Sequence, residues 1–301
     1  MKRIETVIPR TVMRKNVIRA GRAALLALAL FAGAAPVAQG AAAADRELTV
    51  DQFSVVKISV KAVPDARSAR TLGPQREGTG VVIDSSGLVL TIGYLVTEAD
   101  TVELATADGR GFPANVVGYD NVTGLGLVKA LKPLPIKPVD FGESSVTNLR
   151  DVVLIVGYDG VAPAYIVSKR PFVGYWEYLL TEAIYTAPVT VNWQGAALLS
   201  REGKLLGIGS LAVGDAVGRG GVPGNMFVPI DTLKPVLGDF IANGRTTTKP
   251  RPWLGITSQE IQGKVIVTRV TAEGPAEDAG LQAGDIIVGL GGQPLSGQAD
   301  F

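Results

Sequence analysis

EGTGVVIDSSGLVLTIGYLV, residues 77–96, is the stretch that decides the fold of this 301-residue chain. Two runs rich in Val, Ile and Leu, GVVID (80–84) and GLVLTI (87–92), flank the turn sequence Asp84-Ser85-Ser86-Gly87. β-Branched residues favour strands, and Asp, Ser and Gly favour tight turns. The stretch therefore predicts two antiparallel strands joined by a hairpin.

The same succession of short apolar runs and polar turns continues on both sides. Further runs rich in Val, Ile or Leu are SVVKISV (54–60), TVELAT (101–106), DVVLIVG (151–157), KLLGIGS (204–210) and MFVPI (226–230). Another turn signal is Ala107-Asp108-Gly109-Arg110. Many short strands separated by turns are typical of an all-β barrel or sandwich. The best helix candidate is Ile230–Asn243, with Gly244 as its stop.

The composition excludes several kinds of chemistry, because the chain has no Cys and no His. Without Cys it has neither disulfides nor a thiol nucleophile, and without His it lacks an imidazole base. Ser-His-Asp and Cys-His mechanisms are therefore excluded for this chain acting alone. Zinc sites are disfavoured because their usual ligands are missing. We predict no cofactor and no bound metal.

The net charge of +1 conceals an uneven distribution. Residues 1–44 contain seven basic groups and one acidic group, which leaves 22 basic and 27 acidic groups, a net charge of −5, on the rest. Residues 45–301, with their net negative charge, would bind nucleic acid poorly. We therefore predict no nucleic-acid partner.

The first 44 residues have the three parts of a secretory signal peptide. Basic groups end at Arg22, the uncharged stretch Ala23–Ala44 follows with an apolar centre, and small residues close it. Cleavage after Gly40 or Ala44 is expected. The alternative is an uncleaved membrane anchor, since 22 uncharged residues could span a bilayer. Either way we expect export, and a cysteine-free exported chain fits a bacterial periplasm.

The order of turns and strands resembles the HtrA (DegP/DegS) family of trypsin-like peptidases followed by a PDZ domain. The segments that carry the resemblance are 77–96, YDNVTGLGLVK (119–129), NWQGAALLSREGKLLGIGS (192–210) and MFVPID (226–231). The resemblance covers roughly Leu48 to Phe301. It implies an all-β fold, with a trypsin-like double antiparallel β-barrel followed by a small α+β PDZ domain that is truncated.

On this basis we expect a signal peptide at 1–44, a trypsin-like domain at 45–243, a linker at 244–252 and a partial PDZ domain at 253–301. The linker GRTTTKPRP has no apolar residue except its prolines, and its Pro end is semi-stiff.

The three positions that correspond to the family's catalytic triad carry other residues. The family motif Thr-Asn-x-His-Val-Val is here Thr91-Ile-Gly-Tyr-Leu-Val96, which puts Tyr94 at the base position. A phenol titrates near ~10, too high for an efficient base at neutral pH. In the Asp motif, the orienting carboxylate is replaced by Gly124. In Gly-Asn-Ser-Gly-Gly, the nucleophile is replaced by Gln194, an amide.

The oxyanion loop that the resemblance implies is also altered. Its residues here are Asn192, Trp193 and Gln194. Two backbone N–H groups of this loop stabilise the tetrahedral oxyanion in active members, at about 3–4 kcal/mol per donor. The donors could persist here. Trp193 is either a packing residue, a ring that fills the substrate pocket, or a platform on which a ligand stacks.

The C-terminal segment resembles the carboxylate-binding loop of HtrA-type PDZ domains at Trp253, Leu254, Gly255 and Ile256. Such a loop holds a peptide C-terminus with backbone N–H groups while the peptide adds a strand to the sheet. Only 49 residues follow from Trp253 to Phe301. We therefore expect a fragment of a longer protein, which as given binds C-terminal peptides weakly or not at all.

Two other features have alternative interpretations. Ser168-Lys169 suggests a Ser-Lys dyad, but neighbours on a strand face opposite ways, which disfavours it. The aromatic run PFVGYWEYLL (171–180) is either a strand packed on the second barrel or an exposed recognition surface.

The residues together predict an exported HtrA-like pseudoprotease that binds polypeptides, or a protease partner, as a scaffold or regulator in protein quality control. The alternative is an active serine-type endopeptidase working through a non-standard site or a partner's residues. A third hypothesis is a purely structural envelope protein. Expected partners are polypeptide C-termini, unfolded segments or an active protease homologue, and the resemblance also implies a homotrimer.

Overall fold

The computed structural model describes residues 48–173, 179–218, 220–244 and 253–300. The predicted signal peptide and most of the predicted linker lie outside these residues, as do Tyr175, Trp176 and Tyr178 of the aromatic run. Among the described residues, no helix is long and apolar enough to cross a membrane.

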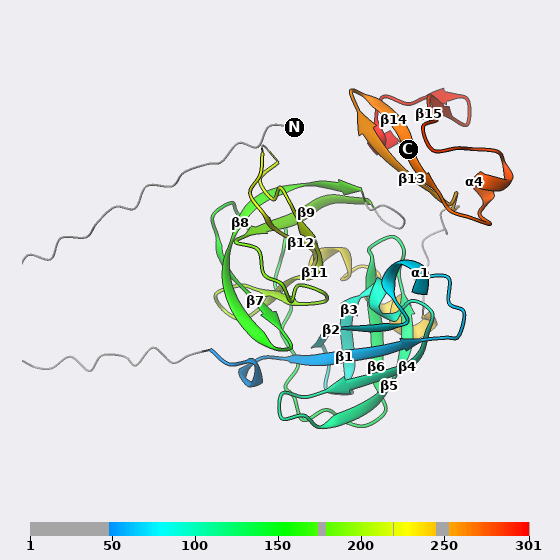
Figure 1. Cartoon of the computed structure of the whole chain (residues 1–301). Helices are drawn as coiled ribbons and strands as arrows, with labels where there is room; N and C mark the ends of the chain where they lie inside the picture. The colour runs from blue at the N-terminus through cyan, green and yellow to red at the C-terminus, as the bar shows by residue number, and fades with distance from the viewer. Residues whose placement is uncertain (1–47, 174–178, 219, 245–252, 301) are drawn as a thin grey trace, which may run out of the picture. The chain divides into compact units, whose positions relative to one another are not determined.

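The first barrel is a closed sheet with the strand order β1-β2-β3-β6-β5-β4 (Figure 1). Its strands are β1 (Val55–Ala62), β2 (Gln75–Val82), β3 (Leu88–Ile92), β4 (Ala99–Ala105), β5 (Gly111–Tyr119) and β6 (Leu125–Ala130). Three short helical segments accompany them: η1 (Val50–Gln52), α1 (Ala69–Leu72) and α2 (Gly93–Val96).

The second barrel is a closed sheet with the order β10-β11-β12-β9-β8-β7. Its strands are β7 (Val152–Gly157), β8 (Gly160–Val173), β9 (Leu179–Ala187), β10 (Ala197–Leu199), β11 (Leu205–Val213) and β12 (Gly224–Pro229). Two closed antiparallel barrels confirm the predicted all-β, trypsin-like fold.

The hairpin predicted from residues 77–96 is present between β2 and β3, with Val81 opposite Leu90 and Val82 opposite Val89. The Asp84 carboxylate accepts the N–H groups of Ser86 and Leu88, each at 2.9 Å, and Gly87 adopts φ +87°. These are the turn functions expected of Asp and Gly.

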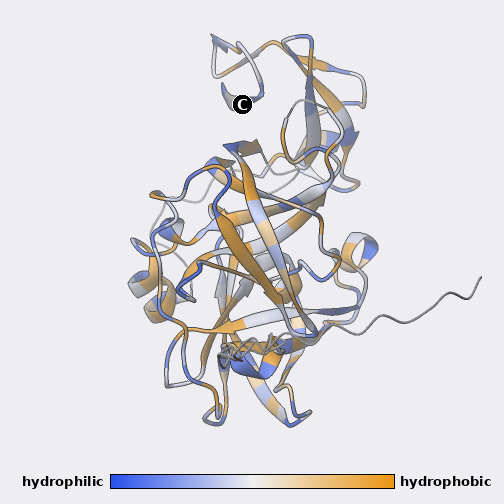
Figure 2. Cartoon of the chain, turned by 90° about the vertical axis from the view of Figure 1, so that its left-hand side faces the viewer, coloured by the Kyte–Doolittle hydropathy of each residue, from blue (hydrophilic) through white to orange (hydrophobic). Residues whose placement is uncertain are grey.

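Apolar side chains of both barrels form the core, and hydrophobic residues follow the barrel strands while hydrophilic ones gather at turns (Figure 2). Fully buried residues include Ile58, Leu90 and Leu127 in the first barrel and Ile155 and Phe227 in the second. Burying each such side chain contributes about 1.5–3 kcal/mol, and this stabilises a chain that has no disulfides. From the aromatic run, Phe172 in β8 is half-buried against the core.

The prediction of one helix over Ile230–Asn243 was wrong in its extent. The structure has a 3-10 turn, η2 (Ile230–Thr232), and a separate helix α3 (Leu237–Asn243). Pro235 separates them, because proline lacks an N–H and disfavours helical backbone at the preceding residue. The predicted stop is confirmed, since Gly244 ends α3 with φ +66°.

The C-terminal body contains a three-stranded sheet of order β13-β14-β15 and a two-stranded sheet. Its elements are β13 (Ile256–Ile261), β14 (Lys264–Val270), α4 (Pro275–Asp278), β15 (Ile286–Ile287), β16 (Gly289–Leu290), β17 (Gln293–Pro294) and η3 (Gln298–Asp300). This small mixed sheet-and-helix unit matches the α+β body that the sequence predicts.

Candidate functional site

Tyr94 lies on the short helix α2, directly after β3 of the first barrel. Its ring is half-buried against the core, and its hydroxyl donates a hydrogen bond of 3.0 Å to the carbonyl oxygen of Ser210. Ser210 is fully buried in β11 of the second barrel. The phenol therefore links the two barrels at the position where the family's base would stand.

Arg76 fixes the backbone on which Tyr94 is carried. This β2 residue is only 5% exposed, and its guanidinium donates to the carbonyl oxygens of Tyr94 (3.0 Å) and Thr97 (2.6 Å). It also donates to the Ser68 hydroxyl at 2.6 Å, and burial lowers its pKa. Sequence reasoning missed Arg76. The signal in the sequence was a single arginine close to the apolar run of β2. Its side chain proves to face inward.

Gly124 lies in the turn before β6 and adopts φ +76°, a conformation that favours glycine. Its carbonyl accepts the N–H of Gly93, the residue before Tyr94, at 2.8 Å, and its own N–H donates to the Asp120 carbonyl at 2.8 Å. The Asp120 carboxylate accepts the N–H of Thr123 at 3.0 Å. Asp120 is thus a turn residue, and the hydrogen bond from Gly93 to Gly124 joins this turn to the start of α2.

Gln194 lies in the loop before β10, where its carbonyl accepts the Thr79 N–H at 2.8 Å. The next residue, Gly195, has φ +73°, and its N–H donates to the Gly209 carbonyl at 2.8 Å. A Cβ atom on Gly195 would lie 2.1 Å from the Thr79 oxygen. Glycine is therefore required there, because the loop passes tightly between strands of the two barrels.

The structure brings the three predicted triad positions together. Gly78 lies between two of them. A Cβ atom added to Gly78 would lie 2.5 Å from a methyl carbon of Leu95, the neighbour of Tyr94, and 2.8 Å from the Gln194 carbonyl oxygen. The hydrogen bond from Gly93 to Gly124 connects the third position to the same helix. The three positions therefore lie close together in the structure, and their correspondence to a catalytic triad stays a prediction.

Asn192 and Trp193 complete the loop. The Asn192 side-chain amide donates to the carboxylate of Asp159, a residue just after β7 that sequence reasoning did not single out. Trp193 is half-buried, and its carbonyl accepts the Ala196 N–H at 3.1 Å. Within the described residues, the backbone N–H groups of Asn192 and Gln194 donate to no acceptor.

The side chains at these positions differ from the nucleophile, base and orienting acid that acyl transfer by a serine mechanism uses. Gly124 has no side chain to orient a base, and the Gln194 amide has no nucleophilic oxygen. The Tyr94 hydroxyl already donates its proton to Ser210. Whether the backbone N–H groups of this loop serve as oxyanion donors stays a prediction.

Ser168 and Lys169 do not form a dyad. Lys169 Nζ donates to the carbonyl oxygens of Ser145 and Thr147, each at 3.2 Å, and pairs with Glu182 at 3.4 Å. The Ser168 hydroxyl instead accepts from Arg170 at 2.9 Å. In the part of the chain that the structure describes, no group of three or more Asp or Glu residues is arranged to hold a metal ion.

The predicted carboxylate loop lies at the start of β13. Gly255 has φ +76°, and a Cβ atom there would lie 3.3 Å from the Trp253 ring. The Gly255 carbonyl accepts the Thr271 N–H at 2.7 Å, and the Leu254 carbonyl accepts the Ala276 N–H at 2.9 Å. Trp253 and Leu254 are exposed, and Ile256 begins the outer strand of the sheet. The role of these residues in carboxylate binding stays a prediction.

Comparison with known families agrees with both parts of the chain. Residues 78–208 match a trypsin-like peptidase domain, and residues 246–300 match a PDZ domain. The barrel match contains all three triad positions, and the PDZ match contains the predicted carboxylate loop.

Individual proteins similar to this chain are also named as proteases of the HtrA type. A Synechocystis sp. protein named as the serine protease HhoA is 30% identical over 73% of this chain and 61% of its own length. A Pseudomonas putida protein named as DegP-like periplasmic serine endoprotease is 30% identical over 78% of this chain and 51% of its own. The chain thus spans about half to three-fifths of the length of these relatives. The solved HtrA-type protease AlgW with tripeptide has a TM-score of 0.52 at 24% identity, covers 81% of each chain, and agrees in fold.

Proposed function

Because this chain belongs to the HtrA family of trypsin-like peptidases with a PDZ domain, we propose that it is a pseudoprotease that binds polypeptides without cleaving them. It acts as a scaffold or regulator of HtrA-class protein quality control. Its relatives are named as serine proteases, whereas this chain carries Tyr94, Gly124 and Gln194 at the positions that the family motifs give to the triad.

The proposal rests on one observation. The three positions that the family motifs give to the triad carry Tyr94, Gly124 and Gln194. Hydrolysis by a serine mechanism needs a nucleophile, a base within hydrogen-bond reach and a group that orients the base. All three are replaced, and the chain has no His or Cys to substitute for them. Backbone hydrogen-bond donors and substrate binding alone would still accelerate hydrolysis relative to the reaction in water, but far less than a complete triad does.

Polypeptide binding is supported by what remains. The unpartnered N–H groups of Asn192 and Gln194 can donate to a peptide carbonyl in the barrel site. The chain matches the PDZ family, whose members bind peptide C-termini by strand addition. Structural relatives were solved with a tripeptide and a decapeptide. We propose the exposed residues Trp253 and Leu254 and the adjoining Gly255 and Ile256 as the C-terminus contact.

Two further parts of the proposal concern the cellular location of the protein and its oligomeric state and partners. Relatives are named as periplasmic enzymes, and residues 1–44 have the pattern of an export signal. We therefore place the protein in the periplasm. The family resemblance implies a homotrimer, and the replaced triad positions lead us to propose an active protease homologue as a partner. Light scattering of the purified chain, alone and with such a homologue, tests both.

The experiment that tests the function measures binding and cleavage in one sample. Fluorescently labelled unfolded casein is titrated with the full chain, its anisotropy is followed, and the same mixture is then run on a gel. We expect a saturable rise in anisotropy with intact casein. Saturable binding with fragments would support an endopeptidase with a non-standard site, and no binding would favour a structural envelope protein. Either result overturns the proposal.

A further inference from the structure

Ser210, which receives the Tyr94 hydroxyl, is the extra residue of a β-bulge in β11. The register of the pairing between β11 and β12 shifts between Gly209 and Leu211, on either side of Ser210. A bulge interrupts the regular ladder and re-aims the groups of the extra residue. This explains why the Ser210 carbonyl can accept a donor from the first barrel, the Tyr94 hydroxyl at 3.0 Å.

Beyond Ser210, the edge of β11 that faces β10 is open. β10 pairs with β11 only as far as Ile208, which lies opposite Ala197. Residues Leu211–Val213 pair with β12, and in the part of the chain that the structure describes no strand pairs with their other edge. Ala212 in this segment is exposed. An extended polypeptide can therefore bond to this edge through backbone groups.

The loop that carries Gln194 borders the same edge. The Gly195 N–H donates to the Gly209 carbonyl, and the Gly209 N–H donates to the Ala196 carbonyl, each at 2.8 Å. Ser210 is the next residue of β11. A polypeptide that contacts this loop and also bonds to the open edge therefore passes Ser210.

In the structure the Ser210 carbonyl is out of reach of such a polypeptide. Ser210 has no exposed surface, whereas Tyr94, whose hydroxyl contacts the carbonyl, is only half-buried. A polypeptide N–H can bond to this carbonyl only after the phenol has moved away from it. The hydroxyl and the polypeptide therefore compete for one acceptor.

The backbone that carries Tyr94 can stay in place while its side chain moves. The Arg76 guanidinium donates to the carbonyl oxygens of Tyr94 and Thr97, at 3.0 and 2.6 Å. The Gly93 N–H donates to the Gly124 carbonyl at 2.8 Å. None of these bonds involves the Tyr94 side chain. Rotation from one staggered side-chain conformation to another is therefore enough to withdraw the hydroxyl.

We propose that Tyr94 is an autoinhibitory latch on the polypeptide site of the two barrels. The latch is closed when the Tyr94 hydroxyl bonds to the Ser210 carbonyl, and a polypeptide opens it by donating a backbone N–H to that carbonyl instead. This inference rests on the proposed binding of polypeptides and adds how that binding is regulated. Because one hydrogen bond replaces another, the latch lowers the affinity for polypeptides without abolishing it.

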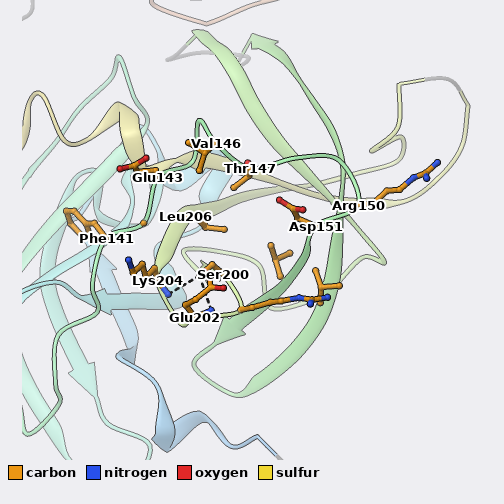
Figure 3. A pocket seen from close by; sticks show the side chains of 14 residues that line it. Phe141, Glu143, Val146, Thr147, Arg150, Asp151, Ser200, Glu202, Lys204 and Leu206 are labelled. Atoms are coloured by element: carbon orange, nitrogen blue, oxygen red, sulfur yellow. Dashed lines mark hydrogen bonds between the residues drawn. The ribbon is translucent and has the colours of Figure 1, made fainter.

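The second barrel also has a hollow of about 630 Å³ beside β7 and β10 (Figure 3). Its charged side chains are of both signs and favour no class of ligand: Arg150, Arg201 and Lys204 with Glu143, Asp151 and Glu202. Tyr94 and Ser210 do not line this hollow. A substitution of the exposed Arg201 therefore provides a control for the latch.

The test follows casein binding and the environment of Tyr94 in one titration of the full chain. The chain is labelled with 3-fluorotyrosine, which gives a fluorine NMR signal for each of its seven tyrosines. The signal that is missing from Tyr94→Phe identifies Tyr94, and unlabelled casein contributes no signal. Casein affinity is measured by anisotropy for the unmodified chain, Tyr94→Phe and two controls, Tyr165→Phe and Arg201→Ala.

We expect the Tyr94 signal to shift as casein saturates the chain. Tyr94→Phe should bind casein about two- to tenfold more tightly than the unmodified chain, because the polypeptide no longer competes with a hydroxyl for the Ser210 carbonyl. Tyr165→Phe and Arg201→Ala should bind casein like the unmodified chain.

Two failures can be told apart. If casein binds saturably but the Tyr94 signal does not shift, or if Tyr94→Phe binds casein no more tightly, the latch is overturned and the proposed binding of polypeptides stands. If neither the unmodified chain nor Tyr94→Phe binds casein, the proposed function is overturned and the latch with it.

Discussion

The hydroxyl of Tyr94 donates a hydrogen bond of 3.0 Å to the carbonyl oxygen of Ser210, and this bond joins helix α2 of the first barrel to β11 of the second. In an active relative the same position would hold the catalytic base. The bond gives Tyr94 a structural role, and its energetic contribution can be measured.

Replacing Tyr94 with Phe should destabilise the protein by about 0.5–1.5 kcal/mol, because the fully buried Ser210 loses a hydrogen-bond donor. Urea denaturation measures the change. Tyr165→Phe is the matched control, because Tyr165 is 54% exposed. Equal midpoints for the two variants would show that the contact between the barrels contributes nothing.

Replacing Arg76 with Ala should cost about 2–4 kcal/mol, because the carbonyl oxygens of Tyr94 and Thr97 lose a buried charged donor. Thermal unfolding gives the change, and exposed Arg70→Ala should be near neutral. An Arg76 variant as stable as the Arg70 variant would contradict the assigned role.

Replacing Gly124 with Asp alone should destabilise the protein by about 1–2 kcal/mol, because φ there is +76°. Gly160→Asp is the comparison, since a Cβ atom there meets nothing within 4 Å and its φ is not positive. Similar urea midpoints for the two variants would refute the strain argument. If the strain is present, the family's carboxylate cannot be restored here without a backbone change.

Asp231 should make stability fall in acid. Burial alone would raise the pKa of Asp231, but hydrogen bonds from Lys234 and from Ser144 and Ser145 lower it from 3.8 to about 2. Because the folded pKa is below the unfolded one, the stabilisation is complete above about pH 4 and is lost as the pH falls toward 2.

The loss should amount to about 2 kcal/mol, since one pKa unit corresponds to ~1.4 kcal/mol. Urea midpoints at pH 4 and pH 2 measure it. Asp231→Asn should show a smaller drop than the unmodified chain, whereas Asn at the exposed Asp100 should show the same drop. An unchanged drop in Asp231→Asn would contradict the prediction.

The fold could be predicted because it depends on local patterns. The apolar runs around Asp84–Gly87 form β2 and β3 as expected, since the strand preference of β-branched residues and the turn preference of Asp, Ser and Gly act over a few positions. The helix predicted over Ile230–Asn243 was too long, because Pro235 alone is enough to divide that stretch.

Sequence motifs located the residues of the candidate site, but they did not predict the hydrogen bonds that these residues form. Tyr94 and Ser210 are separated by 116 positions, and only the packing of the two barrels brings them together. Asn192 with Asp159 in the second barrel and Arg76 with Thr97 in the first are likewise distant in sequence, and the folding of each barrel brings them together. Side-chain contacts between distant strands leave no periodic signal in a single sequence, whereas residue types at motif positions do.

The most direct measurement of the central claim is the rate of casein hydrolysis by the purified full chain, compared with its Tyr94→Phe and Gln194→Ala variants. Absence of the triad predicts that all three release no fragments above the buffer control. Hydrolysis by the unmodified chain that either substitution abolishes would contradict the claim, because it would show that these residues support catalysis.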